Sequence, residues 1–353
     1  MSDTELQDEN LEPGQVQDDD LYEEITIVAD KGQEPLRIDK FLLNRLDKVS
    51  RNKIQNAVKA ESVLVNETPV KTNYRIKPFD KITVVLYKPS REFPMEAENI
   101  PLEIVYEDQY LVVLNKQAGL VVHPGSGNYT GTLVNALMHH FGNLPDLSAQ
   151  NQRPGIMHRL DKNTSGLMVI AKDEFCMSHL AKQFFDRTIK RTYQALVWGE
   201  PAEPEGKVEI NIGRHKRFRK KMDVFTEEEE GKYAVTNYKL LESIGYVSVV
   251  ECVLETGRTH QIRVHMKYLG NPVFNDEVYG GDRIIKGTIH SKYKQFIDNC
   301  FKICPRQALH AKSLGFYHPI LKKDMFFESE IPNDMQLLIE KWKNYYKFAL
   351  NQS

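Results

Sequence analysis

The sequence of 353 residues has few cysteines and no long apolar segment, and both absences exclude whole classes of protein. Four cysteines are too few for a disulfide framework in a chain of this length, so we expect reduced thiols. No apolar run approaches the roughly 20 residues that cross a bilayer, and the first 24 residues are acidic where a signal peptide would be basic and then apolar. We therefore predict a cytoplasmic protein with no membrane partner.

Glycine motifs for nucleotides are also absent, since the sequence contains neither G-x-G-x-x-G nor G-x-x-x-x-G-K-[ST]. Positive charge is missing from residues 1–24, which hold ten acidic residues and no Lys or Arg. Such a block cannot bury enough apolar surface to fold, so we predict a disordered acidic tail over residues 1–24. The rest of the chain then carries a surplus of eight positive charges, which suits a nucleic-acid partner.

Hydrophobic periodicity divides the remaining chain into a small and a large unit. Residues 25–88 contain helical patterns that begin near Leu36 and Ser50, followed by strand patterns at 63–65 and 77–87. Residues 89–101 contain three prolines and little periodicity, which indicates a linker. The larger unit then covers residues 102–353.

Strand patterns outnumber helical patterns in the larger unit. We expect strands at 102–108, 110–116, 166–172, 191–199, 233–242, 246–255 and 323–329, and helices at 131–141, 174–185 and 333–350. Consecutive strands are often joined by short loops, which favours antiparallel pairing. The predicted fold class is α+β, with a mixed, mostly antiparallel β-sheet flanked by helices.

The segment 153–172 (RPGIMHRLDKNTSGLMVIAK) places an acid on a loop in front of a buried strand. Catalytic groups gather on loops that rigid elements hold in place, and Asp161 has such a position. A single Asp in a loop is more often a turn cap or the partner of a nearby cation such as Arg159. The residue types alone leave both roles open.

The whole string HRLDKNTSGLMVIAK resembles the hallmark motif of the RluA family of RNA pseudouridine synthases. Blocks that resemble the family also include VLNKQAGLVVHPG, KRTYQALVWG, LETGRTHQIRVHM, GNPVFNDEVYGG and RQALHAKSLGFYHP. Residues 36–86 resemble the S4 domain, an RNA-binding module, so the chain is most similar to the ribosomal large subunit pseudouridine synthase D group. The resemblance implies an S4-like domain at 25–88, a catalytic domain of the pseudouridine synthase fold at 102–353, and an intramolecular isomerase without cofactor or metal.

The resemblance also implies roles for single residues. Asp161 corresponds to the essential aspartate, as nucleophile or as base, and Tyr193 to a tyrosine that stacks on the target uracil. Arg258 corresponds to the arginine that forms an ion pair with this aspartate, which keeps a buried carboxylate ionised. Arg159 corresponds to the residue that enters the RNA stack after the base has flipped out, and we assign His158 beside it to RNA contact.

Basic residues in two regions are candidates for RNA binding, although charges on such helices are often only a solvated surface. They lie in the S4-like helices and in the segment 213–222 (GRHKRFRKKM), and they are Arg37, Lys40, Arg51, Lys53, Arg214, Lys216, Arg217, Arg219 and Lys220. The expected partner is ribosomal RNA of the 23S type or a pre-ribosomal particle, bound by a monomer.

Two groups of metal-ligating residues need separate consideration. Cys300 and Cys304 lie one helical turn apart with His290 and His310 nearby, but C-x-x-x-C lacks the paired two-residue spacings of common zinc modules. The two histidines of THQIRVH, residues 259–265, are interpreted as a strand-borne pair with a structural or RNA-facing role. We expect no metal site.

Three alternatives to a ribosomal RNA isomerase stay open. The first is a ribosome-assembly factor that binds RNA without catalysis, although such a protein needs none of the three catalytic candidates. The second is the same chemistry on transfer RNA. The third is a glycosidic hydrolase, which would need a second carboxylate to activate water, and no acid in the matched motifs besides Asp161 and Glu255 suggests this role.

Overall fold

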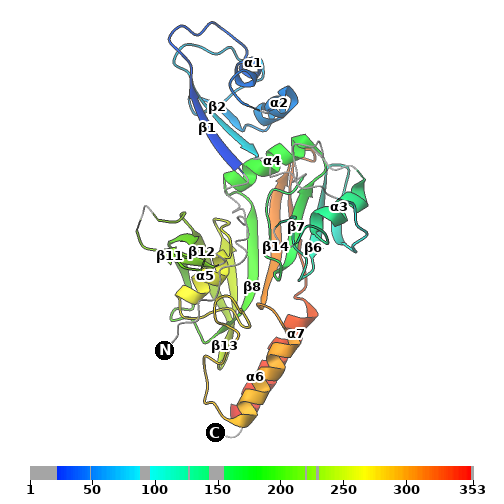
Figure 1. Cartoon of the computed structure of the whole chain (residues 1–353), viewed down its shortest axis with the longest axis vertical. Helices are drawn as coiled ribbons and strands as arrows, with labels where there is room; N and C mark the ends of the chain where they lie inside the picture. Colours follow the sequence, from blue (N-terminus) through cyan, green and yellow to red (C-terminus); the bar gives the residue numbers. More distant parts are fainter. Residues whose placement is uncertain are drawn as a thin grey trace, which may run out of the picture.

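The computed structural model describes residues 22–47, 49–87, 96–125, 128–142, 155–218, 221–227 and 230–350. They form two bodies, and the smaller, N-terminal one lies at the top of Figure 1. The predicted acidic tail lies outside the described residues except at its end, where residues 22–24 begin the strand β1 (Tyr22–Val28). The prediction extends the tail three residues too far, because Glu23 and Glu24 are exposed positions of an edge strand rather than part of an unstructured block.

The smaller body is an antiparallel sheet with two helices against it. Its other elements are α1 (Ile38–Leu43), α2 (Arg51–Lys59), β2 (Val63–Val65), β3 (Thr68–Pro69) and β4 (Lys81–Tyr87), with the strand order β1-β4-β2-β3. Helix α2 begins after Ser50, whose side chain accepts a hydrogen bond of 3.2 Å from the backbone N–H of Lys53. The apolar face predicted for the first helix is confirmed, since Ile38, Phe41 and Leu42 are all buried.

The larger body contains a sheet of nine strands. They are β5 (Glu103–Glu107), β6 (Leu111–Lys116), β7 (Ser165–Ala171), β8 (Lys190–Trp198), β9 (Glu205–Glu209), β12 (Val235–Ile244), β13 (Val247–Leu254), β14 (Leu309–His318) and β15 (Lys323–Glu328). The order is β5-β6-β7-β14-β8-β13-β12-β9, with β15 paired to β14. Only β7 and β14 pair in parallel, so the predicted mixed, mostly antiparallel sheet is confirmed. A separate hairpin joins β10 (Asn211–Arg214) to β11 (Met222–Phe225).

Five helices accompany this sheet in the described part of the chain: α3 (Leu133–Phe141), α4 (Glu174–Phe185), α5 (Gln261–Tyr268), α6 (Ser291–Ile303) and α7 (Asn333–Leu350). The three predicted helices are confirmed as α3, α4 and α7. The strand interpretation of residues 259–265 is wrong, because most of this segment lies in α5. Every residue from Gln261 to Met266 is buried, and polar and apolar residues alternate along this segment, which is the period of a strand in the sequence. None of the described helices has the length and apolar character of a membrane span.

The two bodies contact each other through α2 and α4, which lie side by side in Figure 1. Asn52 and Asn56 of α2 donate side-chain hydrogen bonds of 2.8 and 3.2 Å to the Glu174 carboxylate at the start of α4. The Tyr22 hydroxyl of β1 donates to the backbone carbonyl of Met157. The smaller body is therefore attached next to the segment that leads into Asp161.

Candidate active site

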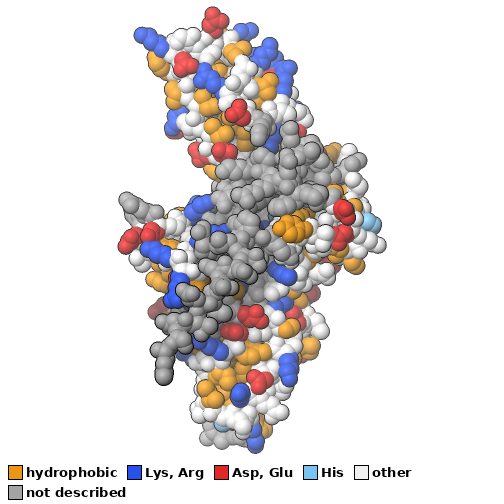
Figure 2. All heavy atoms as spheres, viewed as in Figure 1, with side chains coloured by type: hydrophobic (Ala, Val, Ile, Leu, Met, Phe, Trp, Pro, Cys, Tyr) orange, Lys and Arg blue, Asp and Glu red, His pale blue; other side chains and the backbone are white. Residues whose placement is uncertain are grey.

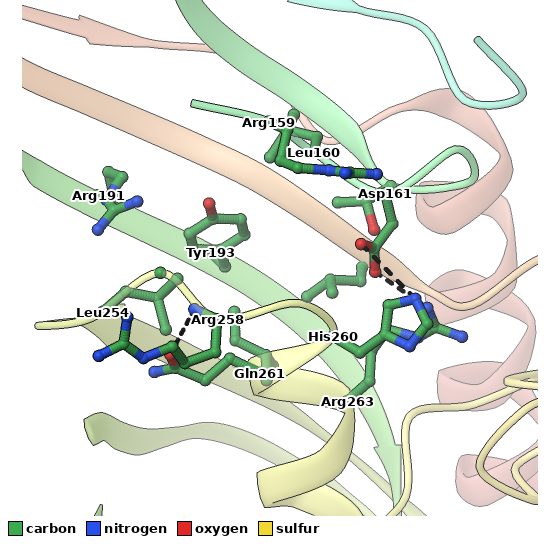
Figure 3. Close-up of a pocket in the computed structure, with 14 residues that line it drawn as sticks. Arg159, Leu160, Asp161, Arg191, Tyr193, Leu254, Arg258, His260, Gln261 and Arg263 are labelled. Atoms are coloured by element: carbon green, nitrogen blue, oxygen red, sulfur yellow. Dashed lines mark hydrogen bonds and ion pairs between the residues drawn. The ribbon is translucent and has the colours of Figure 1, made fainter. Parts of the chain in front are cut away.

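Asp161 lies in a pocket formed by the loop before β7, strand β8 and the start of α5 (Figure 3). The structure brings four predicted residues into this pocket, because Arg159, Tyr193 and Arg258 also line it. They come from segments that are far apart in the sequence. The sheet order explains their meeting, since β14 pairs with both β7 and β8 and so holds the two segments close together.

Strand β7 holds the Asp161 loop rigidly. All seven residues of β7 are buried, and the backbone N–H of Thr164 closes a turn on the Asp161 carbonyl at 3.0 Å. Gly166 has a φ of +125°, and a Cβ atom there would lie 2.3 Å from the backbone oxygen of Ala311 in β14. Only glycine permits this close approach of β7 and β14, which sets the position of the loop.

Lys116 at the end of β6 also fixes this loop, although it is not among the site residues predicted from the sequence. Its side chain is 1% exposed, and its Nζ donates hydrogen bonds to the backbone carbonyls of Gln117, Leu120 and Lys162 at 2.9 to 3.1 Å. Burial lowers the pKa of Lys116 to about 7, against the opposing effect of the nearby Asp161. The amine ties the residue after Asp161 to the turn that follows β6.

An arginine from α5 makes the ion pair with Asp161. Arg263 Nη1 lies 2.9 Å from Asp161 Oδ2, while its Nε and Nη2 donate to the buried Asp276 carboxylate at 2.6 and 2.9 Å. Burial alone would raise the pKa of Asp161, but His260 and Arg263 together lower it to about 2. Burial also lowers the pKa of His260 to about 4, so this ring is neutral at pH 7. Arg263 is then the paired charge that keeps Asp161 ionised.

The predicted ion pair between Arg258 and Asp161 is therefore corrected. Arg258 Nε donates to the Tyr233 carbonyl at 2.8 Å, and Figure 3 shows its guanidinium directed away from Asp161. Arg263 takes the predicted place, five residues later in the same LETGRTHQIRVH block. Arg258 precedes α5, whereas Arg263 lies on its first turns facing the pocket. An interpretation of the block as a helix could have identified Arg263 as the candidate.

Tyr193 and Arg159 lie where the predictions need them. Tyr193 is a buried residue of β8, and Figure 3 shows it in the pocket between Arg191 and Asp161. The Arg159 guanidinium lies close to Asp161 in the same view and contributes to the low pKa of that carboxyl. The pocket therefore holds an aromatic side chain, a carboxylate and several cations, a combination suited to a flipped base on a phosphate backbone.

His158 does not face the pocket, and its assignment to RNA contact is wrong. The side chain is buried, Nε2 accepts a hydrogen bond of 3.1 Å from the Val169 backbone, and the ring stacks on Phe184 at 4.7 Å between centroids. Burial lowers its pKa to about 3, so the ring is neutral at pH 7. The buried His158 ring therefore links the Asp161 loop to β7 and α4.

His260 faces the pocket from the residue before α5, with its backbone in the left-handed region at a φ of 58°. Its Nε2 lies 3.9 Å from Asp161 Oδ1, and its Nδ1 lies 2.8 Å from the Tyr279 hydroxyl. That hydroxyl accepts a hydrogen bond of 3.0 Å from the Met222 backbone N–H, so its own proton is available for His260 Nδ1. This pattern assigns the remaining ring proton to Nε2, on the side of Asp161. The second histidine, His265, is buried against Thr236.

The S4-like basic residues surround helices α1 and α2, where Figure 2 shows Lys and Arg side chains on the smaller body. Arg37 and Arg51 both contact the Asp39 carboxylate, at 2.9 and 3.2 Å. Burial would raise the pKa of Asp39, but these arginines and Gln55 lower it to about 2. Asp39 therefore holds two cations at one surface, near the exposed Lys40 and the half-buried Lys53. Their contact with RNA stays a prediction.

The second basic group lies on the hairpin of β10 and β11. Arg214 ends β10, while Lys216 and Arg217 follow it, and Lys216 forms an ion pair of 2.8 Å with Glu230. The predicted residues Arg219 and Lys220 lie outside the described residues. RNA contact by this hairpin also stays a prediction.

The cysteines considered as metal ligands pack in an apolar layer. Cys300 and Cys304 are buried among residues of α6 and α7, and the Cys304 thiol lies 3.6 Å from the Arg306 carbonyl. Within the described ranges, no three His, Cys, Asp or Glu residues are arranged to hold a metal ion.

Comparison with known proteins gives matches along most of the chain. Residues 110–268 match the family described as RNA pseudouridylate synthase, and residues 36–82 match the S4 domain. A protein of Chlorobaculum parvum, named an uncharacterized RNA pseudouridine synthase, is 44% identical over 319 residues, 90% of this chain and 97% of that protein. Ribosomal large subunit pseudouridine synthase D of Zymomonas mobilis is 42% identical over 307 residues, 86% of this chain and 93% of that protein.

A solved structure is similar as well. Human RNA Pseudouridylate Synthase Domain Containing 4 has a TM-score of 0.50 and 27% sequence identity, and the match covers 68% of this chain and 93% of that one.

Proposed function

The chain belongs to the RNA pseudouridine synthase family, whose members isomerise uridine to pseudouridine, and we propose that its substrate is large-subunit ribosomal RNA and its reactive group Asp161. In this isomerisation the bond from N1 of uracil to C1′ of ribose breaks and a bond from C5 to C1′ forms. C5 loses a proton and N1 gains one, so the atoms of the nucleotide balance without a second substrate. No cofactor is needed for these steps.

The observation that carries the assignment of Asp161 is a mostly buried, ionised carboxylate that lines the pocket. Its side chain is 19% exposed and its pKa is about 2, so it is negatively charged at every pH at which RNA is handled. Such a carboxylate can attack C1′ directly or remove a proton from the ribose, and it stabilises positive charge that develops at the sugar. Both roles are compatible with the site.

The same pocket argues against the hydrolase alternative. Of the described residues that line it, Asp161 is the only acid. The neighbouring Asp276 uses its oxygens for Arg263 and for the backbone N–H groups of Val278 and Tyr279, so it has little capacity to activate water. An RNA-binding assembly factor without catalysis would have no use for a buried, ionised carboxylate, whose desolvation costs stability.

The other pocket residues have supporting roles in the proposal. Tyr193 stacks on the flipped uracil, and Arg159 takes the place that the base leaves in the RNA stack. Arg263 keeps Asp161 ionised and oriented. Arg258 forms part of the pocket wall on the side away from the carboxylate.

Ribosomal RNA is favoured over transfer RNA by the names of relatives. The S4 match supports an RNA partner of either kind. The basic surfaces of the smaller body and of the β10–β11 hairpin would contact phosphates of a folded RNA. The proposal includes a monomer that acts in the cytoplasm, where its ribosomal substrate is.

The test is pseudouridine formation by the purified protein on three RNAs: transcripts of large-subunit ribosomal RNA, transcripts of small-subunit RNA and a pool of transfer RNA. Pseudouridines are mapped at single-nucleotide resolution, with Asp161→Asn as the matched control. We expect specific positions in large-subunit RNA only, without added cofactor or metal. Modification of transfer RNA alone would overturn the substrate assignment, and an active Asp161→Asn variant would overturn the assignment of the carboxylate.

A further inference from the structure

Arg191 in β8 is a buried cation for which no other part of the described chain provides a counter-charge. Its side chain is 8% exposed, and its Nε has no hydrogen-bond partner among the described residues. No salt bridge within the described ranges involves its guanidinium, which lies 5.4 Å from the centre of the Phe184 ring. Arg191 is two residues before Tyr193 on the same strand, so both side chains lie on the pocket side of β8 (Figure 3).

The other two buried arginines of the described chain show what such a group normally has. Arg263 bonds to two carboxylates, and Arg306 bonds to the Asp334 carboxylate at 2.7 and 2.9 Å and to backbone carbonyls. A buried charge without a partner costs free energy, and a folded protein retains one mainly where function requires it. Arg191 is therefore placed to receive an anion from outside the protein.

The surroundings of Arg191 indicate which anion. Arg191, Gly257 and Arg258 line both the active-site pocket and an adjoining cleft that reaches β1 of the smaller body. The cleft also contains three carboxylates, of Glu24, Asp186 and Glu255, and none of them pairs with Arg191. An RNA chain whose uracil reaches Tyr193 has to pass Arg191 as its backbone leaves the pocket through this cleft. A guanidinium fork can bind two oxygens of one phosphate.

We propose that Arg191 binds a backbone phosphate next to the flipped uridine and so holds the RNA strand at the mouth of the pocket. The inference rests on the proposed function, because it needs an RNA substrate in this pocket. It adds a binding residue that acts on the strand rather than on the base or the sugar.

The first test removes the charge and compares stability with binding. Arg191→Met keeps the length of the apolar stem over Phe184, so we expect an unfolding midpoint equal to or above that of the wild type, since an unpaired charge is removed. Binding of a substrate hairpin, measured in an Asp161→Asn background to prevent turnover, should weaken about tenfold or more. A variant that loses stability and binding together would indicate a structural role and would overturn the proposal.

The second test identifies the phosphate. Hairpins carry one uncharged methylphosphonate linkage, placed in turn at the linkages on either side of the target uridine and at the next one outward on each side. A 2′-O-methyl ribose protects each modified linkage. At one linkage, we expect the protein with Arg191 and the Arg191→Gln variant to bind the hairpin within about twofold of each other. The methylphosphonate at that linkage has already removed the phosphate charge that Arg191 contacts. If the protein with Arg191 binds more tightly than Arg191→Gln by the same factor at every modified linkage, the proposal is overturned.

Two controls complete the design. Arg191→Lys should recover part of the affinity, because it restores the charge without the fork. Lys190→Gln removes a charge from the exposed neighbour on β8 and should show no coupling to any linkage. Pseudouridine formation by the unaltered enzyme is measured in parallel. If the enzyme forms none, the proposed function fails, whereas an active enzyme without linkage coupling refutes only the role of Arg191.

Discussion

Replacing Arg263 with Met tests whether the chain ionises Asp161 in the way that the structure indicates. The guanidinium lies between two carboxylates, at 2.9 Å from Asp161 and at 2.6 and 2.9 Å from Asp276. Met fills a similar volume but carries no charge. Asp161 and the fully buried Asp276 would then face each other with no cation between them.

The size of the effect follows from the pKa of Asp161. Its fall from 3.8 to about 2 corresponds to about 2 to 3 kcal/mol in favour of the ionised form. Arg263 supplies a part of this lowering, beside His260 and Arg159. Without it, burial should raise the pKa of Asp161 enough for the rate at pH 7 to fall between about 10- and 100-fold. Breaking a buried ion pair also costs about 3 to 5 kcal/mol of stability, so the unfolding midpoint should drop by about 10 °C.

The assay is single-turnover pseudouridine formation from about pH 6 to about pH 9, beside equilibrium RNA binding. For Arg263→Met, the rate should recover toward high pH, where the carboxyl ionises without help. Arg263→Lys should be intermediate, since a point charge cannot serve two carboxylates as a planar fork does. Arg258→Met, which keeps the Arg263 pair, should leave the shape of the pH profile unchanged. An Arg263→Met enzyme with the wild-type rate and profile, beside a shifted profile for Arg258→Met, would refute this reasoning.

Three further predictions concern the pH dependence of stability, the Tyr279 hydroxyl behind His260, and RNA docking. Burial lowers the pKa of four histidines from 6.5 to about 3 to 4: His158, His260, His265 and His310. As the pH falls from 6.5 toward 4, only the unfolded chain takes up these protons, so the free energy of unfolding should fall by several kcal/mol in that window. A free energy of unfolding that stays constant from pH 6.5 to pH 4 would contradict this prediction. Tyr279→Phe removes the hydroxyl between Met222 and His260 but keeps the ring near Arg263. The variant should slow single turnover about tenfold while RNA affinity changes less than about twofold. An equal loss of rate and affinity would argue against a role of Tyr279 in positioning His260. Lys40→Gln with Lys53→Gln leaves the Asp39 cluster intact and should weaken binding of ribosomal RNA and reduce its salt dependence, with turnover of short hairpins retained; unchanged salt dependence would remove these lysines from the RNA surface.

The sequence predicts the larger features of this fold because they repeat over many residues. The strands predicted at β6, β7, β8 and β13 and the helices predicted at α4 and α7 are confirmed, as is the mostly antiparallel sheet, although β7 is buried at every position instead of alternating. Helix α5 is missed because the polar residues Gln261, Arg263 and His265 alternate with apolar ones, which is the period of a strand. Strand β14 is missed although its segment is recognised as a family block. Residues 89–101 stay a predicted linker, of which only residues 96–101 are described, without regular structure.

The candidate site is predicted in part, and the errors concern side-chain direction. Motif position alone identifies Asp161, Tyr193 and Arg159 as residues of one pocket, and the structure brings them together. It cannot tell whether His158 points into the pocket or into the core, since this depends on how the loop packs against β7 and Phe184. It also cannot choose between Arg258 and Arg263, because the choice depends on where α5 begins.

The central claim is that Asp161 acts on the substrate and does not dock it. The most direct measurement compares the wild type with Asp161→Asn in single-turnover pseudouridine formation and in equilibrium binding of the same RNA. A carboxylate that acts at the sugar makes no phosphate contact, so we predict no detectable product with an RNA affinity within about threefold of the wild type. Product formation at the wild-type rate, or a loss of affinity as large as the loss of rate, would contradict the claim.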